Sequence, residues 1–350
     1  MKRRLWAVGS DGFGVYEADW TESGPNLSRS LGEPEGLLAP GFVDLHIHGA
    51  FGFDFMSASS KELLQLADRL GGAGYEAFLP TTVSCSAEEA LDAANRLPND
   101  PRTPGFHLEG PFLSPRYPGA QPKEAIIEPP DGPSEWDEVL DHPKLRLATV
   151  APERPGAPGL IRRLSRRGVS VSMGHTDASY AEAEAGVSAG ATNVTHAFNA
   201  MRPFHHREPG IVGLFLTKDS LVTEVIYDRF HVSREALALL LKARPLDRIV
   251  AVSDGTLFAG GTKEEARSMW GHEVESKGGR VVLKGTDTLA GSAITLLDAF
   301  RNVWEDFGPE AAIRMCCLNP RTALAMSERA RVYVEFDCQK TLVAVRRVHG

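Results

Sequence analysis

The sequence predicts an α/β fold, a (β/α)8 TIM-like barrel with a small β-sandwich domain built from the two chain ends. From Gly41 onward, short apolar runs rich in β-forming residues alternate with amphipathic helical stretches, a pattern typical of parallel sheets built from βα units. Eight such runs can be counted, and eight parallel strands close a barrel of this type. The 350 residues are also enough for one barrel of about 250 residues with a small second domain.

The first half of the barrel is predicted from helix signals as well as from apolar runs. Four apolar side chains between residues 61 and 70 share one helical face, and Gly71-Gly72 ends that helix. The segment Ser86-Ala87-Glu88-Glu89 has the form of a capping box and opens the next helix. The four strands predicted in this half are 42–46, 77–82, 105–109 and 145–150.

The second half repeats the same alternation. A basic helix over 160–167 leads through Gly168 into a strand, and Ser233 caps a helix over 234–243. Two further helices are predicted at 180–189 and 294–307. The four strands predicted in this half are 169–173, 191–195, 221–227 and 249–253.

Segments outside the βα alternation predict antiparallel strands. Asp11-Gly12 marks a turn between short apolar stretches, and residues 331–337 with 341–348 predict a hairpin near the other end of the chain. A further hairpin is predicted over 270–284, around Lys277-Gly278-Gly279. We therefore predict a small β domain of residues 1–39 and 328–350, and a barrel domain of residues 40–327.

Composition limits the classes of partner. With 38 Lys and Arg against 46 Asp and Glu, the net charge is −8, and the absence of a Lys/Arg-rich run argues against nucleic acid or an anionic membrane surface as partner. The apolar stretch after the basic residues Lys2, Arg3 and Arg4 is too short for a signal peptide, so we expect a cytoplasmic protein. Four cysteines, two of them adjacent, are too few for a disulfide framework.

Side chains that suit metal ligation follow the predicted strand ends. In a barrel of this kind the active site lies where the carboxyl ends of the strands meet, so side chains at those ends converge. Two histidines at positions i and i+2 of a strand also project to the same side. The residues are His46 and His48 at the first strand, Glu109 at the third, His175 at the fifth, His196 at the sixth and Asp254 at the eighth.

Each of these residues has a simpler interpretation when taken alone. His46 and His48 could be solvated or bonded to backbone, Glu109 could be a paired surface carboxylate, and Asp254 could be a helix N-cap. Their coincidence at five strand ends predicts a metal site. Imidazoles and carboxylates without thiolate suit a divalent transition metal such as Zn, Fe, Mn or Co in a hydrolytic role, with Asp254 placed to transfer a proton.

Seven motifs carry a resemblance to a known family. The chain resembles the N-acetylglucosamine-6-phosphate deacetylases of the amidohydrolase superfamily, in order and spacing, from residue 40 to about residue 327. The motifs HLEGP and THxxNAM are close to family-specific, whereas HxH indicates only the superfamily. The strings are PGFVDLHIHG (40–49), HLEGPF (107–112), GHTDAS (174–179), THAFNAM (195–201), REPG (207–210), SDG (253–255) and LAGS (289–292).

The resemblance implies roles for the predicted metal ligands. It implies that Glu109, His175 and His196 bind the principal metal, and that His46 and His48 hold a second ion with Glu109 bridging. One or two ions per subunit are therefore expected. By the same resemblance, Asp254 matches the catalytic base and acid.

The resemblance also implies a phosphosugar substrate and a homodimer. Asn199, Ala200 and Arg207 match phosphate contacts, although a surface ion pair with Glu208 is the alternative for Arg207. His231 resembles a residue that the family contributes across a dimer interface. Other expected substrate contacts are Ala120, Gln121 and the loop over the sugar, Leu289, Ala290 and Gly291.

Three departures from the family pattern concern specificity. The family usually has Gly-Ala-His after HLEGP, where this chain has Gly119-Ala120-Gln121. Arg229 stands where the family usually has Gly, two residues before His231. The run after Asp254, residues 255–260, also differs from the usual one. These differences leave the metal chemistry intact and affect the sugar and acyl specificity.

The predicted function is metal-dependent deacetylation of N-acetyl-D-glucosamine 6-phosphate to D-glucosamine 6-phosphate and acetate. Two alternatives remain open at this point. One is a related amidohydrolase that acts on N-acetylgalactosamine 6-phosphate or another N-acylated sugar or amino acid. The other is a non-catalytic barrel that serves as a scaffold or sugar-phosphate sensor, although such a protein has no reason to keep all the ligand positions together with Asp254.

Overall fold

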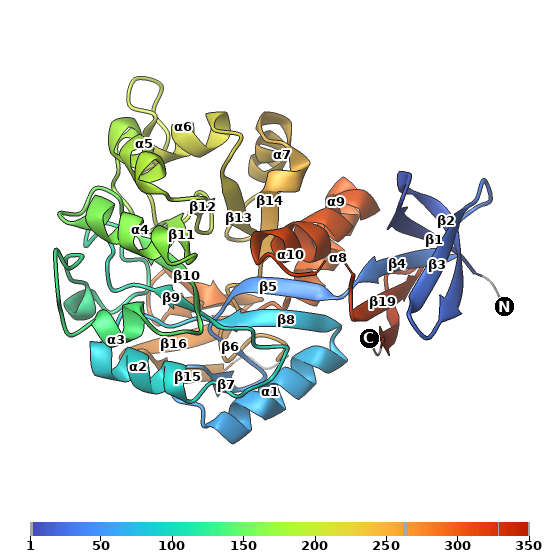
Figure 1. The fold of residues 1–350 in the computed structure, drawn as a ribbon, viewed down its shortest axis with the longest axis horizontal. Coiled ribbons are helices and arrows are strands. Elements are labelled where there is room, and N and C mark those ends of the chain that lie inside the picture. The colour runs from blue at the N-terminus through green and yellow to red at the C-terminus, as the bar shows by residue number, and fades with distance from the viewer. Residues whose placement is uncertain (1–2, 262–264, 328, 349–350) are drawn as a thin grey trace.

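The computed structural model describes residues 3–261, 265–327 and 329–348 (Figure 1). A large body of strands surrounded by helices occupies one side of the molecule, and a smaller sheet that carries both chain ends occupies the other. The predicted domain limits at residues 1, 328 and 350 lie outside the described residues.

The central strands of the large body form a parallel α/β barrel, as predicted. Six consecutive strands pair in parallel in the order β14-β13-β12-β11-β10-β9, and β5 pairs in parallel with β8. Single bridges close the ring, from Thr81 to His107 and from Ile47 to Gly255. The strands are β5 (Phe42–Ile47), β8 (Tyr75–Pro80), β9 (Phe106–Glu109), β10 (Leu145–Val150), β11 (Ser170–Met173), β12 (Asn193–Val194), β13 (Val222–Ile226) and β14 (Ile249–Val252).

Two of the helices around the barrel begin at the caps that the sequence predicts. Ser86 and Glu89 form the predicted capping box, and Ser233 accepts a hydrogen bond from the Ala236 N–H. Within the described residues, no helix is long and apolar enough to cross a membrane. The helices are α1 (Ser60–Gly72), α2 (Ala87–Asn95), α3 (Asp137–Leu140), α4 (Ala157–Arg166), α5 (Tyr180–Ala189), α6 (Gly210–Thr217), α7 (Arg234–Ala243), α8 (Leu296–Phe307), α9 (Pro309–Ile313) and α10 (Asn319–Ala323).

The prediction missed α6 for a physical reason. Its sequence, GIVGLFLT, is apolar all round, and six of its eight residues are buried. A helix without a polar face has no amphipathic period, so sequence reasoning finds nothing that separates it from a buried strand.

Strands from both chain ends form one six-stranded sheet, which confirms that the terminal hairpin joins the N-terminal strands. The order is β20-β19-β4-β1-β2-β3, and β19 pairs antiparallel with β4, with Tyr333 opposite Pro40. The division of this region into the two layers of a sandwich stays a prediction. The strands are β1 (Arg3–Gly9), β2 (Gly12–Thr21), β3 (Gly24–Arg29), β4 (Gly36–Pro40), β19 (Val332–Asp337) and β20 (Leu342–Arg347).

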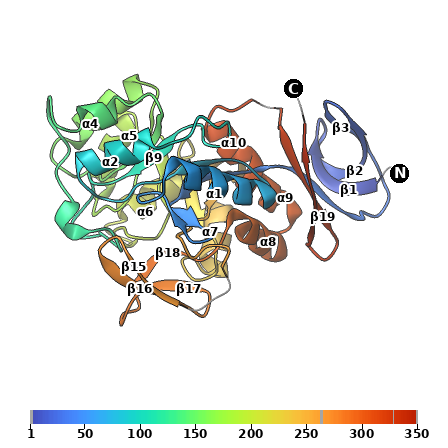
Figure 2. The same ribbon diagram turned by 90° about the horizontal axis from the view of Figure 1, so that it is seen from below.

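A four-stranded antiparallel sheet lies beside the barrel (Figure 2). It is formed by the part of the chain that follows β14 and precedes α8. The predicted hairpin is its central pair, β16 (His272–Lys277) and β17 (Arg280–Leu283). Its outer strands, β15 (Glu265–Met269) and β18 (Leu289–Ser292), were not predicted, because EARSM is largely polar and LAGS is short and contains glycine. A bridge between Gly255 and Ser292 joins this sheet to the end of β14.

Candidate active site

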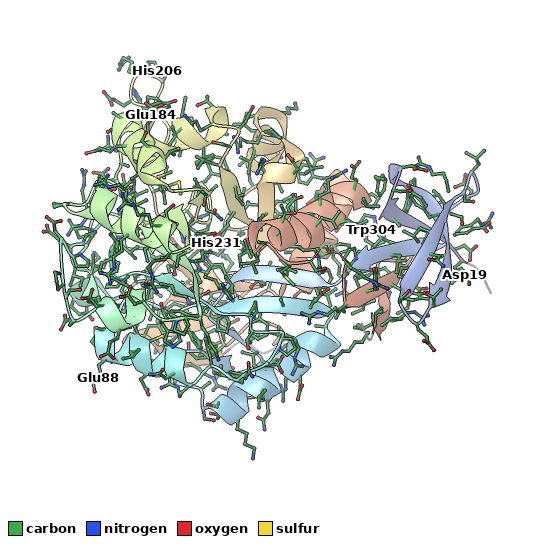
Figure 3. All side chains as sticks on the ribbon, in the orientation of Figure 1. Asp19, Glu88, Glu184, His206, His231 and Trp304 are labelled. Carbon is green, nitrogen blue, oxygen red and sulfur yellow. The ribbon has the colours of Figure 1, made fainter. Side chains whose placement is uncertain are left out.

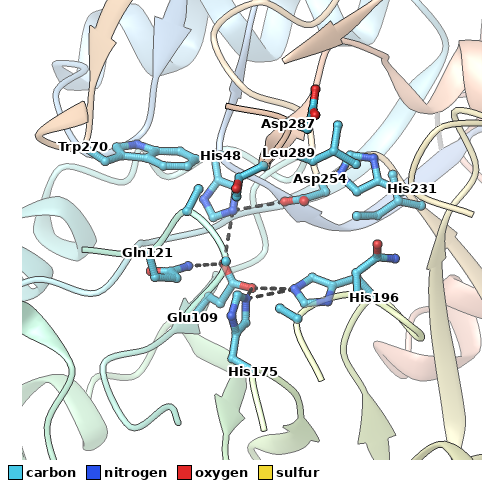
Figure 4. Close-up of a pocket in the computed structure, with 17 residues that line it drawn as sticks. His48, Glu109, Gln121, His175, His196, His231, Asp254, Trp270, Asp287 and Leu289 are labelled. Atoms are coloured by element: carbon cyan, nitrogen blue, oxygen red, sulfur yellow. Dashed lines mark hydrogen bonds and ion pairs between the residues drawn. The ribbon is translucent and has the colours of Figure 1, made fainter. Parts of the chain in front are cut away.

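Two groups of buried side chains at the carboxyl ends of the barrel strands could each hold a metal ion. One group is His46, His48 and Asp254, and the other is Glu109, His175 and His196, with the ligand atoms of each group within 4.8 Å of one another. The structure therefore brings together all six residues for which the sequence predicted metal or proton-transfer roles (Figure 4).

Left-handed backbone turns directly after the strands direct three of these side chains. His175 follows β11 with φ 46°, His196 follows β12 with φ 29°, and Asp254 follows β14 with φ 48°. Residues other than glycine rarely adopt such angles, and strained positions of this kind cluster at functional sites. The same unusual backbone conformation occurs at three strand ends. This indicates that the conformation is retained because it sets the direction of the side chains, and not because it stabilises the chain locally.

The ligand atoms of the group around Glu109 Oε1 lie close to one common point. The Nε2 atoms of His175 and His196 each lie 3.1 Å from Glu109 Oε1 and 3.1 Å from one another. Nδ1 of His175 donates to the carbonyl oxygen of Tyr117 at 3.0 Å, so a neutral His175 presents the lone pair of Nε2 to this point. Two imidazoles and a carboxylate directed in this way fit a divalent transition metal.

The second group lies on the other oxygen of Glu109. Glu109 Oε2 is 3.3 Å from His46 Nε2 and 3.2 Å from His48 Nε2, and Asp254 Oδ1 lies at the same distances from these two nitrogens. Nδ1 of His48 donates to the carbonyl oxygen of Thr81 at 3.1 Å, which again leaves Nε2 for a ligand. One oxygen of Glu109 thus faces each group, as the bridging role requires.

The two carboxylates favour positive charge between them. Burial lowers the pKa of His48, but hydrogen bonds to Asp254 and Glu109 outweigh it and raise that pKa to about 9. Burial raises the pKa of Asp254, but the neighbouring His46 and His48 lower it to about 2. A divalent cation would supply the positive charge that protonated imidazoles otherwise provide. The two pKa shifts therefore also fit a metal at this place.

A cavity of about 280 Å³ opens above the two groups. His46 lies beneath its floor, fully buried. The predicted site residues that line the cavity are His48, Glu109, Ala120, Gln121, His175, His196, Asn199, Ala200, His231, Asp254, Leu289 and Gly291. Other lining residues, which the sequence did not single out, are Gly119, Ile226, Trp270, Asp287 and Thr288.

Arg207 lies away from this cavity. It is exposed, its Nη1 is 2.9 Å from Nε2 of His206, and it is not among the residues that line the cavity. Figure 3 shows the neighbouring His206 at the edge of the molecule, far from His231. The predicted phosphate contact of Arg207 is therefore not formed with the cavity of its own chain.

Ala290 is buried between the lining residues Leu289 and Gly291.

His231 lines the cavity of its own chain, although the resemblance implied a role across an interface. Its Nδ1 lies 2.7 Å from Asp228 Oδ2. Burial lowers the pKa of His231, but the hydrogen bond and charge of Asp228 outweigh it and raise that pKa above its ordinary value. An imidazole whose protonated form is favoured in this way suits an anionic substrate group.

The two single-residue departures from the family pattern have different positions. The Gln121 Nε2 donates to Glu109 Oε2 at 2.8 Å, and its Oε1 accepts from the Ser84 N–H at 2.6 Å, so this amide is fixed against a candidate metal ligand. Arg229 instead forms ion pairs of 2.9 Å with Glu305 and Asp306 and does not line the cavity. Gln121 is thus the departure that touches the site.

Two functional candidates escaped sequence reasoning. Glu224 is buried on β13 with Oε2 3.6 Å from Nδ1 of His46, and its only signal was a charged residue within an apolar strand. Trp270 packs against His48 with ring centroids 4.8 Å apart, and it stands in a short turn that carries no recognisable motif.

Comparisons with known proteins agree with this geometry. The amidohydrolase family model matches residues 37–330. The N-acetylglucosamine-6-phosphate deacetylase of Bacillus subtilis is 34% identical, over 91% of this chain and 86% of the relative. The N-acetylgalactosamine-6-phosphate deacetylase of Escherichia coli is 33% identical, over 83% of this chain and 78% of the relative.

A solved structure shows a similar fold. It is an alanine variant of the N-acetyl-D-glucosamine-6-phosphate deacetylase of Mycobacterium smegmatis, in complex with N-acetyl-D-glucosamine-6-phosphate. It has 28% sequence identity and a TM-score of 0.87, and the match covers 96% of this chain and 94% of the other.

Proposed function

Because the chain belongs to the amidohydrolase family, and within it to the N-acetylglucosamine-6-phosphate deacetylases, we propose that it removes the acetyl group from N-acetyl-D-glucosamine 6-phosphate. The observation that carries this proposal is the pair of buried ligand groups, with one oxygen of Glu109 facing each and with Asp254, a member of the group that contains His46 and His48, lining the cavity. A scaffold or sensor would not need a proton-transfer group at that place.

The reaction is hydrolysis of an amide. The oxygen of water forms a bond to the acetamide carbonyl carbon, the bond from that carbon to nitrogen breaks, and the products are acetate and D-glucosamine 6-phosphate. Asp254 takes the proton of the attacking water and donates it to the departing amine nitrogen. Its low pKa keeps Asp254 ionised, as a proton acceptor has to be.

Glu109, His175 and His196 would hold the principal metal ion, and His46 and His48 would hold a second with Glu109 between them. The ion would be Zn, Fe, Mn or Co, since the donors are imidazoles and carboxylates without thiolate. When bound, such an ion polarises a carbonyl and lowers the pKa of water. Gln121 orients Glu109 by donating to its Oε2.

The walls of the cavity would bind the phosphosugar. Asn199, Ala200 and His231 would contact the phosphate, and the imidazole of His231, whose protonated form Asp228 favours, would attract it. The loop Leu289, Ala290 and Gly291 would cover the sugar. Ala120 would line the wall beside Gln121.

We propose that the protein is a homodimer in which Arg207 contacts the phosphate bound by the partner subunit. Arg207 lies in an exposed loop and does not line the cavity of its own chain, so a phosphate contact from it has to be made to a second copy. An arginine suits this contact because its guanidinium donates two parallel hydrogen bonds to a phosphate.

Mixing two impaired variants tests the contact from Arg207. Arg207→Ala is expected to lower kcat/KM for phosphorylated substrates by about 10- to 100-fold, the value of a charge-assisted hydrogen bond. Mixed with Asp254→Asn chains, it is expected to recover about a quarter of the unmodified activity, because half of the dimers combine an intact Asp254 with an intact Arg207 at one site. No recovery after subunit exchange would show that Arg207 acts within its own chain or not at all.

The substrate is tested by acetate release from three compounds: N-acetylglucosamine 6-phosphate, its galactosamine epimer and unphosphorylated N-acetylglucosamine. We expect efficient turnover of the first, loss of activity after chelation, and recovery when one of the four metals is added back. Preference for the epimer would favour the second candidate, N-acetylgalactosamine 6-phosphate deacetylation, which the similarity to the Escherichia coli enzyme supports. Full activity in metal-free protein would refute the proposed mechanism.

We further propose the domain division given by the sequence, with the barrel domain over residues 40–327 and the small β domain over 1–39 and 328–350. The pairing of β4 with β19 across the two chain ends supports it.

A further inference from the structure

We propose that Trp270 sets the length of the acyl group that this site accepts, by closing the acyl end of the substrate cavity against a second, larger cavity. The inference rests on the proposed deacetylase function and goes beyond it, because it concerns which N-acyl substrates the site admits and which it rejects.

Trp270 is a wall between two cavities. It lines the substrate cavity of about 280 Å³ and also a neighbouring cavity of about 570 Å³. Val83, Leu257 and Met269 give the neighbouring cavity apolar surface. Gln121 belongs to the same wall. It lines the first cavity, and its Oε1 accepts a hydrogen bond from the N–H of Ser84, which lines the second. An acyl chain longer than acetyl would have space in the second cavity if the indole were absent.

The position of the substrate directs its acyl group toward Trp270. The reacting carbonyl carbon has two substituents, the nitrogen that leads to the sugar and the acyl chain, and these point in different directions. Figure 4 shows His231 on one side of the candidate metal ligands, and Trp270 and Gln121 on the other. With the phosphate bound near His231, the acyl chain extends toward the indole.

Trp270 is held firmly in this position. Its Nε1 donates to Asp54 Oδ2 at 2.9 Å, and its ring packs on His48. The hydrogen bond is made to Asp54 and the ring contact to His48, and both residues lie outside the hairpin that carries Trp270. A side chain fixed at both its polar and its aromatic part makes a rigid limit to the cavity.

The backbone of the turn indicates that the indole is retained for its place in the cavity. Trp270 and Gly271 are the two central residues of the turn between β15 and β16, with φ of 55° and 79°. Turns of this type favour Asn, Asp or Gly at the first central position. Tryptophan there conflicts with the local preference, and such conflicts are expected at functional positions.

The test compares kcat/KM for N-acetyl, N-propionyl and N-butyryl glucosamine 6-phosphate. Trp270→Asn removes the indole and suits the turn, so the hairpin is expected to keep its fold. We expect the unmodified chain to prefer acetyl strongly, and Trp270→Asn to raise the butyryl-to-acetyl ratio by about tenfold or more, since each misfitted methylene group changes rates by about 10- to 200-fold. Trp270→Phe is the matched control and is expected to keep the acetyl preference, because it retains most of the bulk and loses only the hydrogen bond to Asp54.

The outcomes separate this inference from the proposed function. Normal turnover of the acetyl substrate with an unchanged butyryl-to-acetyl ratio in Trp270→Asn would overturn the inference alone. An equal rise in Trp270→Phe would also overturn it, because bulk would then not be the cause. If the unmodified, metal-loaded chain does not hydrolyse the acetyl substrate, the proposed function fails and this inference fails with it.

Discussion

Replacing Asp254 by Asn is expected to lower kcat by about 10²- to 10⁴-fold, the usual contribution of a general acid–base group. The amide has nearly the shape of the carboxylate but cannot accept a proton from water. The ion at Glu109, His175 and His196 should remain, because Asp254 belongs to the other ligand group. Acetate release and elemental analysis of the same preparation measure the two effects.

The matched control for this variant is Asp287→Asn. Asp287 also lines the cavity but lies outside both ligand groups, so the same chemical change there should cause a much smaller loss of kcat. If Asp254→Asn kept full turnover with its metal in place, or if the two variants lost activity equally, the assignment of proton transfer to Asp254 would be wrong.

Replacing Glu109 by Gln is expected to cause the largest combined loss, of metal and of activity. One oxygen of Glu109 faces each ligand group, so the variant weakens both at once. A lost metal contribution of several kcal/mol corresponds to a fall of about 10³-fold or more in kcat/KM. Metal content by elemental analysis, and acetate release with added Zn, Mn or Co, would show whether the two losses coincide.

A second buried glutamate serves as the control for this loss. Glu76 is as buried as Glu109, but its carboxylate pairs with Arg321, away from the cavity. Glu76→Gln should lower the stability of the fold and leave the metal content unchanged. A Glu109→Gln protein that retained its metal and turned over substrate would contradict the shared-ligand arrangement.

Apolar periodicity and turn chemistry are enough to predict the barrel. Each predicted βα unit alternates a short apolar run with an amphipathic helix, so its elements can be found one at a time, and α5, α7 and β10 match their predicted limits. Two of the elements that escape prediction have no period. The helix α6 is apolar on all sides, and β15 is polar along most of its length, so neither has a pattern that separates it from its surroundings.

The order of residues along the chain is enough to determine which chemical groups reach the site. Parallel strands in a barrel share one rim, so histidines and carboxylates that follow successive strands have to meet there, whatever the details of packing. For this reason the sequence alone groups His46, His175, His196 and Asp254, and adds Glu109 to them.

How those groups face one another, and what encloses them, depends on the packing of the folded chain. The exclusion of Arg207 from the cavity of its own chain and the contact of Trp270 with His48 leave no mark in local sequence. Trp270 and Asp54 are 216 residues apart and still share a hydrogen bond. The physical reason is that such contacts depend on how distant elements pack, and a side chain's own neighbours in the chain do not encode that packing.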